Sequence, residues 1–126
     1  MNERRLGQAR DEVSNPLAWV AQSGARLAFG SDGMPVSALY GIHSAVNGPY
    51  PSQRISADDA IRFYTEGGAW LSFEEEIKGC LVPGALADLV VLDEDPRIDP
   101  ESIRDRRVDQ VFVGGECVYR RPVKEE

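Results

Sequence analysis

The sequence predicts a small domain of mixed class, between α/β and α+β. Its 126 residues leave room for one hydrophobic core. In the first half, amphipathic patterns surround a short apolar segment in the order helix, strand, loop, helix, which is typical of α/β folds. In the second half, two strand patterns flank Gly114-Gly115, a pair that favours a tight antiparallel hairpin.

The first half contains the elements that would carry a functional loop. Asn15 is expected to cap a helix that starts at Pro16 and ends near Gly24. Residues 26–29, three of which are apolar, predict a short strand, and the polar, glycine-containing residues 30–33 predict a turn after it. A second helix is expected next, with one face formed by Val36, Leu39, His43 and Val46.

The middle of the chain predicts a further helix that begins after Ser56, because a serine side chain can accept a hydrogen bond from the first helical turn. The pair Gly67-Gly68 is expected to stop or kink this helix. Residues 69–73 are then expected to resume as a short helix, with Trp70 and Phe73 as buried anchors.

The last third predicts strands. Residues 86–92 are rich in leucine and valine, which favours a strand, and a short helix is expected over residues 100–106. Residues 108–113 and 116–119 are expected to form the hairpin around the two glycines.

Composition and charge exclude several classes of protein. Hydrophobic residues make up 42% of the chain and charged residues 28%, which argues against disorder. The formal net charge is −7, so charge favours neither nucleic acid nor an anionic membrane as a partner. Cys80 and Cys117 have no metal-binding or disulfide spacing and are expected to be buried free thiols in the cytoplasm. We find no signal sequence and no apolar run of membrane-spanning length.

Asp32 is the sharpest candidate for chemistry. It follows directly after the predicted strand of residues 26–29, where a carboxylate could coordinate a metal or accept a proton. The same tetrapeptide, residues 30–33, is also typical of a turn in which the aspartate bonds its own backbone.

A wider pattern resembles a known family. It consists of Gly30-Ser31-Asp32, Leu39-Tyr40-Gly41-Ile42, Ala45-Val46-Asn47, Ser56-Ala57-Asp58-Asp59-Ala60, Tyr64-Thr65, the run from Gly79 through Pro83-Gly84 and Ala87-Asp88-Leu89-Val90-Val91-Leu92 to Asp93, and Val113-Gly114-Gly115-Glu116-Cys117-Val118-Tyr119. Over roughly residues 15–120 this pattern is similar to the carboxyl-terminal portion of the metal-dependent amidohydrolases of family 3, and most similar to their N-substituted formamide deformylase-like branch.

The resemblance implies a fold and a site. It implies that residues 16–78 correspond to the last strand and flanking helices of a (β/α)8 barrel, and residues 79–121 to carboxyl-terminal strands of an accessory β-sandwich. Residues 1–15 would be an extension and residues 122–126 a tail. It also implies that Asp32 is the family's metal-binding and catalytic aspartate, which takes a proton from the water that attacks a carbon–nitrogen bond. Zinc is the expected metal if a complete site is assembled.

Metal-binding histidines are the missing part of that pattern. The only histidine, His43, lies on the helix after Asp32, where a local hydrogen bond or a core edge is its expected role. One carboxylate cannot provide the three or more protein ligands that a hydrolytic metal needs.

Three hypotheses follow: a truncated amidohydrolase that is inactive alone, a subunit of a split enzyme that borrows histidines from a companion chain, or a non-catalytic oligomeric or binding module. Because the last strand of a barrel would lack its neighbours here, we expect a homo-oligomer or a companion chain as partner. The alternative is a monomer in which a sheet of residues 80–120 is covered by the helices of residues 16–73.

Overall fold

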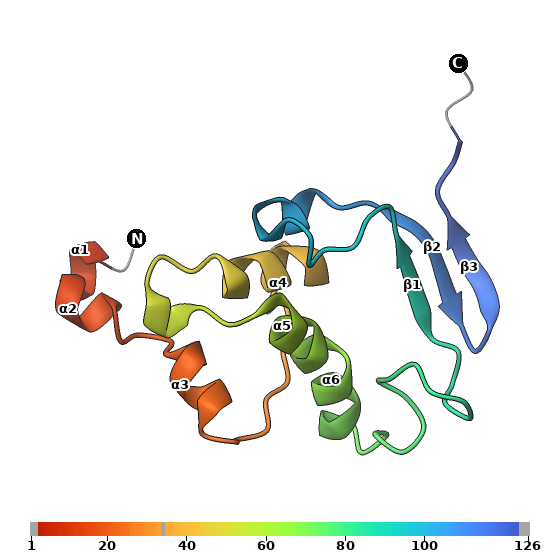
Figure 1. Cartoon of the computed structure of the whole chain (residues 1–126), viewed down its shortest axis with the longest axis horizontal. Helices are drawn as coiled ribbons and strands as arrows, with labels where there is room; N and C mark the ends of the chain where they lie inside the picture. The colour runs from red at the N-terminus through yellow and green to blue at the C-terminus, as the bar shows by residue number, and fades with distance from the viewer. Residues whose placement is uncertain (1–2, 34, 124–126) are drawn as a thin grey trace.

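The chain folds into a group of short helices and a small antiparallel sheet that lie side by side (Figure 1). The computed structural model describes residues 3–33 and 35–123. In these residues the elements are α1 Glu3–Leu6, α2 Gln8–Asp11, α3 Leu17–Gln22, α4 Ala38–Val46, η1 Pro51–Gln53, α5 Ala57–Tyr64, α6 Glu66–Leu71, β1 Leu89–Leu92, η2 Pro100–Asp105, β2 Val108–Val113 and β3 Glu116–Arg120. This segregation of helices and sheet is α+β rather than α/β.

The core lies where α4, α5 and the 3-10 helix η2 meet. Ile42 and Ala45 of α4, Ala60 of α5 and Ile103 of η2 form one buried cluster. Ile103 is completely inaccessible to solvent, although it belongs to the connection between β1 and β2. This connection therefore ties the sheet to the helical core.

The predicted start of α5 is confirmed. The hydroxyl of Ser56 accepts a hydrogen bond from the backbone N–H of Asp59 at 3.0 Å and donates one to the carboxylate of the same residue. The helix that follows does not start after the glycines but includes them, since α6 begins at Glu66. The expectation that Phe73 is a buried anchor is wrong. Phe73 lies beyond the end of α6 with φ of 61° and is 91% exposed, because the chain turns there into a left-handed residue.

The sheet has the strand order β1-β2-β3, with both pairs antiparallel. Gly114 and Gly115 both have positive φ, 57° and 85°, which confirms the predicted tight hairpin. The predicted strand of residues 86–92 is shorter than expected and starts at Leu89. The two residues before it bind the hairpin turn instead, because Ala87 O accepts from the N–H of Gly115 and Asp88 Oδ1 from that of Gly114.

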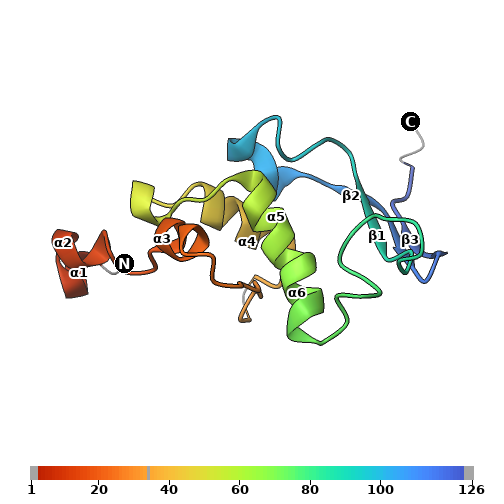
Figure 2. The same cartoon turned by 60° about the horizontal axis from the view of Figure 1, so that its bottom comes forward.

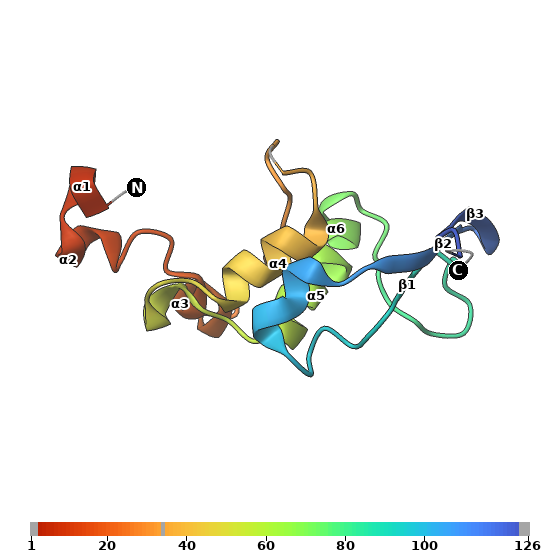
Figure 3. The same cartoon turned by 90° about the horizontal axis from the view of Figure 1, so that it is seen from above.

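In the described part of the chain, no layer of helices covers the sheet. Figure 2 and Figure 3 show the three strands at one end of the molecule, beyond α4, α5 and α6. Every residue of β3 is exposed, and no residue of β1 or β2 is fully buried. The alternative in which helices cover the sheet is therefore wrong.

Two predictions about the first half also need correction. Asn15 has φ of 64°, and no side-chain hydrogen bond caps α3, whose flanking residue is Pro16. Val36 precedes α4 and is 81% exposed, so it does not belong to the buried face of that helix. The cap of α4 is Ser37, whose hydroxyl accepts from the N–H of Tyr40.

Residues 26–29 have no regular secondary structure and do not form a strand, contrary to the prediction. A strand needs a hydrogen-bonded neighbour, and among the described residues this segment has none. Its one recorded backbone bond joins the N–H of Phe29 to the carbonyl oxygen of Phe63 in α5, at 3.0 Å. Side-chain packing holds the segment where a neighbouring strand would otherwise do so.

Candidate active site

Aromatic packing fixes the segment that leads to Asp32. The ring of Phe29 meets the rings of Phe63 and Tyr64 edge-on, at centroid distances of 5.3 and 5.6 Å. Such edge-to-face pairs are favourable beyond the area that they bury. With the backbone bond from Phe29 to α5, they anchor the loop that starts at Gly30.

A glycine lets the same segment pass directly over α6. The carbonyl oxygen of Leu27 lies so close to Gly67 that a Cβ on this glycine would be 2.1 Å from it. No side chain fits at such a distance. Gly67 therefore has a packing role, although the sequence alone predicts only a helix break.

Asp32 lies on the loop that Figure 3 shows reaching away from α4. The residue is exposed and has φ of 45°, in the left-handed region that aspartate and asparagine tolerate better than most residues. Among the described residues no hydrogen bond or ion pair engages its carboxylate. The side chain is therefore available to solvent and to a ligand.

A small pocket of about 190 Å³ adjoins this loop and is rich in hydroxyl groups. Its lining consists of Gly30, Ser31, Pro35, Ser37, Tyr40, Gly41, Ser44 and Tyr64. The phenol oxygen of Tyr64 rests against Gly41, where a Cβ would be only 1.9 Å away. Burial raises the pKa of Tyr64, so its hydroxyl stays protonated at neutral pH and can donate a hydrogen bond.

His43 has a local partner, as expected. Its Nδ1 lies 3.2 Å from Nδ2 of Asn47 on the same helix. The same Asn47 amide also donates to the carbonyl oxygen of Pro100, at 2.9 Å, and so links α4 to η2. Among the described residues no recorded hydrogen bond or ion pair joins His43 to Asp32, and His43 lines neither this small pocket nor the larger one.

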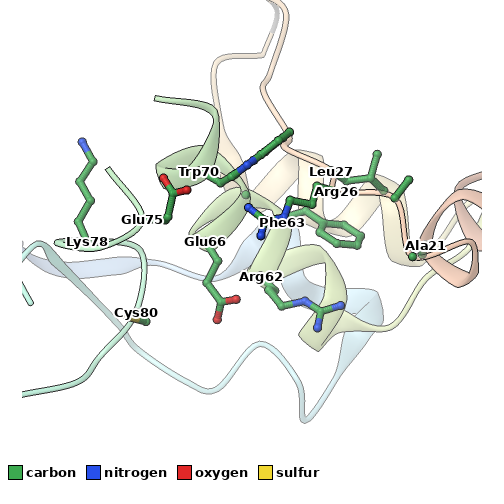
Figure 4. A pocket seen from close by; sticks show the side chains of 13 residues that line it. Ala21, Arg26, Leu27, Arg62, Phe63, Glu66, Trp70, Glu75, Lys78 and Cys80 are labelled. Atoms are coloured by element: carbon green, nitrogen blue, oxygen red, sulfur yellow. The ribbon is translucent and has the colours of Figure 1, made fainter. Parts of the chain in front are cut away.

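The larger pocket, of about 680 Å³, lies at the start of the segment of residues 26–29 (Figure 4). Arg26 and Trp70 meet there, with the guanidinium carbon 5.4 Å from the ring centroid. Charges of both signs line it, from Arg26, Arg62, Lys78, Glu66 and Glu75. Asp32 is not part of this pocket, so its size does not make it the site of hydrolysis.

The two cysteines differ from the expectation and from each other. Cys80 is half-buried at the larger pocket, whereas Cys117 on β3 is exposed, so the prediction of a buried thiol is wrong for Cys117. Cys117 is exposed because no layer covers the sheet. Both thiols are free.

The described residues do not fit a metal centre. No group of three or more His, Cys, Asp or Glu side chains within them is close enough to hold an ion. A metal that activates water needs about three protein ligands and one open position. Asp32 supplies only one carboxylate, so the described residues alone cannot hold an ion at this loop.

No helix in the described ranges is long and apolar enough to cross a lipid bilayer.

Comparison with known proteins gives the class. The chain belongs to the amidohydrolase family, whose family model matches residues 1–119. This confirms the resemblance at the level of the family.

Sequence reasoning did not find the contacts that position the loop, those of Gly67 with Leu27 and of Gly41 with Tyr64, because they join residues distant in sequence.

Two relatives are much longer than the region that they share with this chain. YtcJ of Bacillus subtilis (strain 168), whose name assigns it to the amidohydrolases, is 34% identical over 132 aligned positions, which cover 93% of this chain and 25% of YtcJ. The crystal structure of an amidohydrolase from Thermotoga maritima MSB8 has a similar fold, with a TM-score of 0.62 and 24% identity over 88% of this chain and 26% of that one. The chain thus spans about a quarter of the length of these relatives.

Proposed function

We propose that this chain contributes Asp32 to a hydrolase of carbon–nitrogen bonds other than peptide bonds, and that the chain is inactive by itself. The observation that carries the proposal is the placement of Asp32: an exposed carboxylate without a recorded partner, on a loop anchored by Phe29 to α5. Membership of the amidohydrolase family supports the reaction class.

The chain's own residues would orient Asp32 and let its carboxylate accept a proton or bind a cation. Tyr64 and Phe63 hold Phe29, and the loop after Phe29 presents Asp32 to solvent. A carboxylate in this position can accept a proton from water or bind a cation. The hydroxyl groups of Ser31, Ser37 and Tyr64 beside the loop can hydrogen-bond a polar part of a substrate.

The remaining ligands would come from outside this chain. Because no metal-binding group of three is present in residues 3–33 and 35–123, a zinc ion would need histidines from a companion polypeptide or from a longer form of the protein. A truncated amidohydrolase and a subunit of a split enzyme are the two forms of this proposal. A non-catalytic binding module is the outcome if Asp32 proves dispensable to both.

The proposal also includes a substrate class and a cellular location. The sequence pattern as a whole resembles the formamide deformylase-like branch of the family, so N-substituted formamides are the first substrates to assay. The free thiols of Cys80 and Cys117 favour the cytoplasm, where thiols stay reduced.

Metal content per chain tests the proposal, measured by plasma mass spectrometry on freshly purified protein beside the Asp32→Asn variant. Asparagine also tolerates positive φ, so the substitution removes the charge without straining the loop. We expect no zinc, iron or manganese above the background of the variant, and no hydrolysis of formamides or other amides. About one metal ion per chain that disappears in Asp32→Asn would show a complete site and contradict the inactivity of the isolated chain.

A companion chain is tested by reconstitution. If a histidine-bearing amidohydrolase polypeptide restores turnover, we expect Asp32→Asn to abolish it while the two chains still associate. Full activity of the variant in that assembly would show that Asp32 has no role in the reaction.

A further inference from the structure

The loop that carries Asp32 is fixed to the helices at both of its ends. It spans residues 30–37, between the segment that leads into it and helix α4. Before the loop, the backbone N–H of Phe29 donates to the carbonyl oxygen of Phe63 in α5. After the loop, the hydroxyl of Ser37 caps α4. Holding both ends of a loop restricts the conformations of the residues between them.

One side chain, that of Tyr64 in α5, contacts both sides of this loop. Its ring meets the ring of Phe29 edge-on, at a centroid distance of 5.6 Å. Its phenol oxygen lies against Gly41 of α4, so close that a Cβ on the glycine would be 1.9 Å from it. Tyr64 also lines the small pocket to which Ser31 and Pro35 of the loop contribute. A single residue therefore touches the segment before the loop and the helix after it.

The phenol oxygen of Tyr64 acts at this contact through its size. No hydrogen bond within the described ranges engages it, and burial is the cause of the raised pKa of Tyr64. Glycine inside a helix is less stable than alanine, and the space that Gly41 leaves for the oxygen accounts for its presence. Because protein interiors are close-packed, a displaced Tyr64 ring would also displace the ring of Phe29.

We propose that Tyr64 is a positioning residue for Asp32, whose packing on Phe29 and Gly41 sets where the loop leaves one anchor and enters the next. The proposal rests on the proposed function, in which Asp32 takes part in a reaction. A proton acceptor works only within hydrogen-bond reach of the group that it serves. A misplacement of about 1 Å can lower a rate about a hundredfold, so the position of the loop matters for such a carboxylate. Tyr64 itself touches no reacting atom in this proposal.

NMR relaxation of the backbone amides in the full chain tests the positioning without an activity assay. Tyr64→Leu removes both contacts, and we expect the order parameters of residues 30–33 to fall below about 0.6, while those of α4 stay near about 0.85. The matched control is Tyr40→Leu, at a tyrosine that lines the same pocket but whose ring has no recorded contact with that of Phe29. The control should leave the loop as ordered as in the wild type.

A second set of variants keeps the aromatic ring. Gly41→Ala should shift the amide resonances of residues 30–33, because the new Cβ displaces Tyr64. Adding Tyr64→Phe to this variant removes the oxygen that the Cβ would meet at 1.9 Å, so the resonances should return toward their wild-type positions. Gly68→Ala, which has open space around its Cβ, should leave them in place.

Loop amides that do not respond to Gly41→Ala would overturn the proposal. An equal response to Tyr40→Leu, or no recovery in the double variant, would overturn it as well, because either result would show general loosening around α4. These outcomes are separate from those of the proposed function. A reconstituted enzyme that keeps full activity with Asp32→Asn would refute the role of Asp32 in the reaction, whereas the dependence of the loop on Tyr64 is measured in the chain itself.

Discussion

The helical region and the sheet of this chain are stabilised in different ways. Around α4, α5 and η2, four buried residues pack together, and partly buried side chains such as Phe29 and Tyr64 surround them. The three strands contain no fully buried residue: β3 is exposed along its whole length, and β1 and β2 are at most half-buried. The helices thus have a core of their own, whereas the sheet has a ladder of hydrogen bonds and an exposed surface.

One element packs the sheet's connection into the helical core. Strands β1 and β2 are joined through η2, whose Ile103 is inserted into the helical core. The difference teaches that the sheet depends on the helices through this connection more than the helices depend on the sheet. The predictions below test that asymmetry.

The largest effect is expected at Ile103. Ile103→Ala should lower the free energy of unfolding by about 2–5 kcal/mol, because it leaves a cavity in the helical core and loosens the connection to the sheet. Urea unfolding, followed by circular dichroism, measures it. The control is Ile98→Ala, the same type of truncation at a side chain that is 69% exposed, which should change stability by less than about 0.5 kcal/mol. Equal losses for the two variants would show that the core is elsewhere.

Adjacent glycines of α6 give the next effect. Gly67→Ala should lower stability by about 1–3 kcal/mol, because its Cβ would collide with the carbonyl oxygen of Leu27 and displace the segment before Asp32. Gly68→Ala has open space around its Cβ and should raise stability by up to about 1 kcal/mol, since alanine favours a helix. Thermal unfolding of the two variants compares them. The same sign for both would mean that Leu27 does not pack on α6 as described.

A smaller loss is expected at the start of α5. Ser56→Ala removes the hydroxyl that accepts from the N–H of Asp59 and should cost about 1 kcal/mol. Ser44→Ala serves as the control, because that exposed serine only bonds the carbonyl oxygen of Tyr40 within its own helix. We expect the control to be neutral or slightly stabilising in chemical denaturation. A loss at Ser44 as large as at Ser56 would remove the cap as the explanation.

The smallest effect concerns an exposed ion pair near β1. Hydrogen bonds from Arg97 lower the pKa of Asp95 from 3.8 to about 2. Because the folded pKa lies below the ordinary one, the pair favours the folded state above about pH 4, and this contribution disappears as the pH falls toward 2. In an NMR titration, Arg97→Ala should return the Asp95 pKa toward 3.8, and Arg104→Ala should leave it low. An unchanged Asp95 pKa without Arg97 would contradict the assigned cause.

Local chemistry made part of the fold predictable. Ser56 marks the start of α5 through a bond to a residue three positions away, and Gly114-Gly115 determine a hairpin through their own φ angles. Such features depend on a few consecutive residues. Residues 26–29 have the composition of a strand, but pairing depends on a neighbour that the described chain does not contain, so composition alone misleads there.

The site was less accessible to sequence reasoning than the fold. Asp32 has the form of an ordinary turn residue, and only its place in the wider amidohydrolase pattern singles it out. The contact of Tyr64 with Gly41 and that of Gly67 with Leu27 arise from tertiary packing, for which the sequence carries no local signal. The exposure of Cys117 likewise follows from the uncovered sheet and not from the residues beside it.

Amide hydrogen exchange of the wild-type chain tests the contrast between the two regions most directly. The account predicts strong protection of the amides of α4 and α5, which surround the buried cluster, and much weaker protection of those of β1, which lies at the edge of an uncovered sheet. Protection of β1 that equals that of α4 would contradict the claim that only the helical region has a buried core.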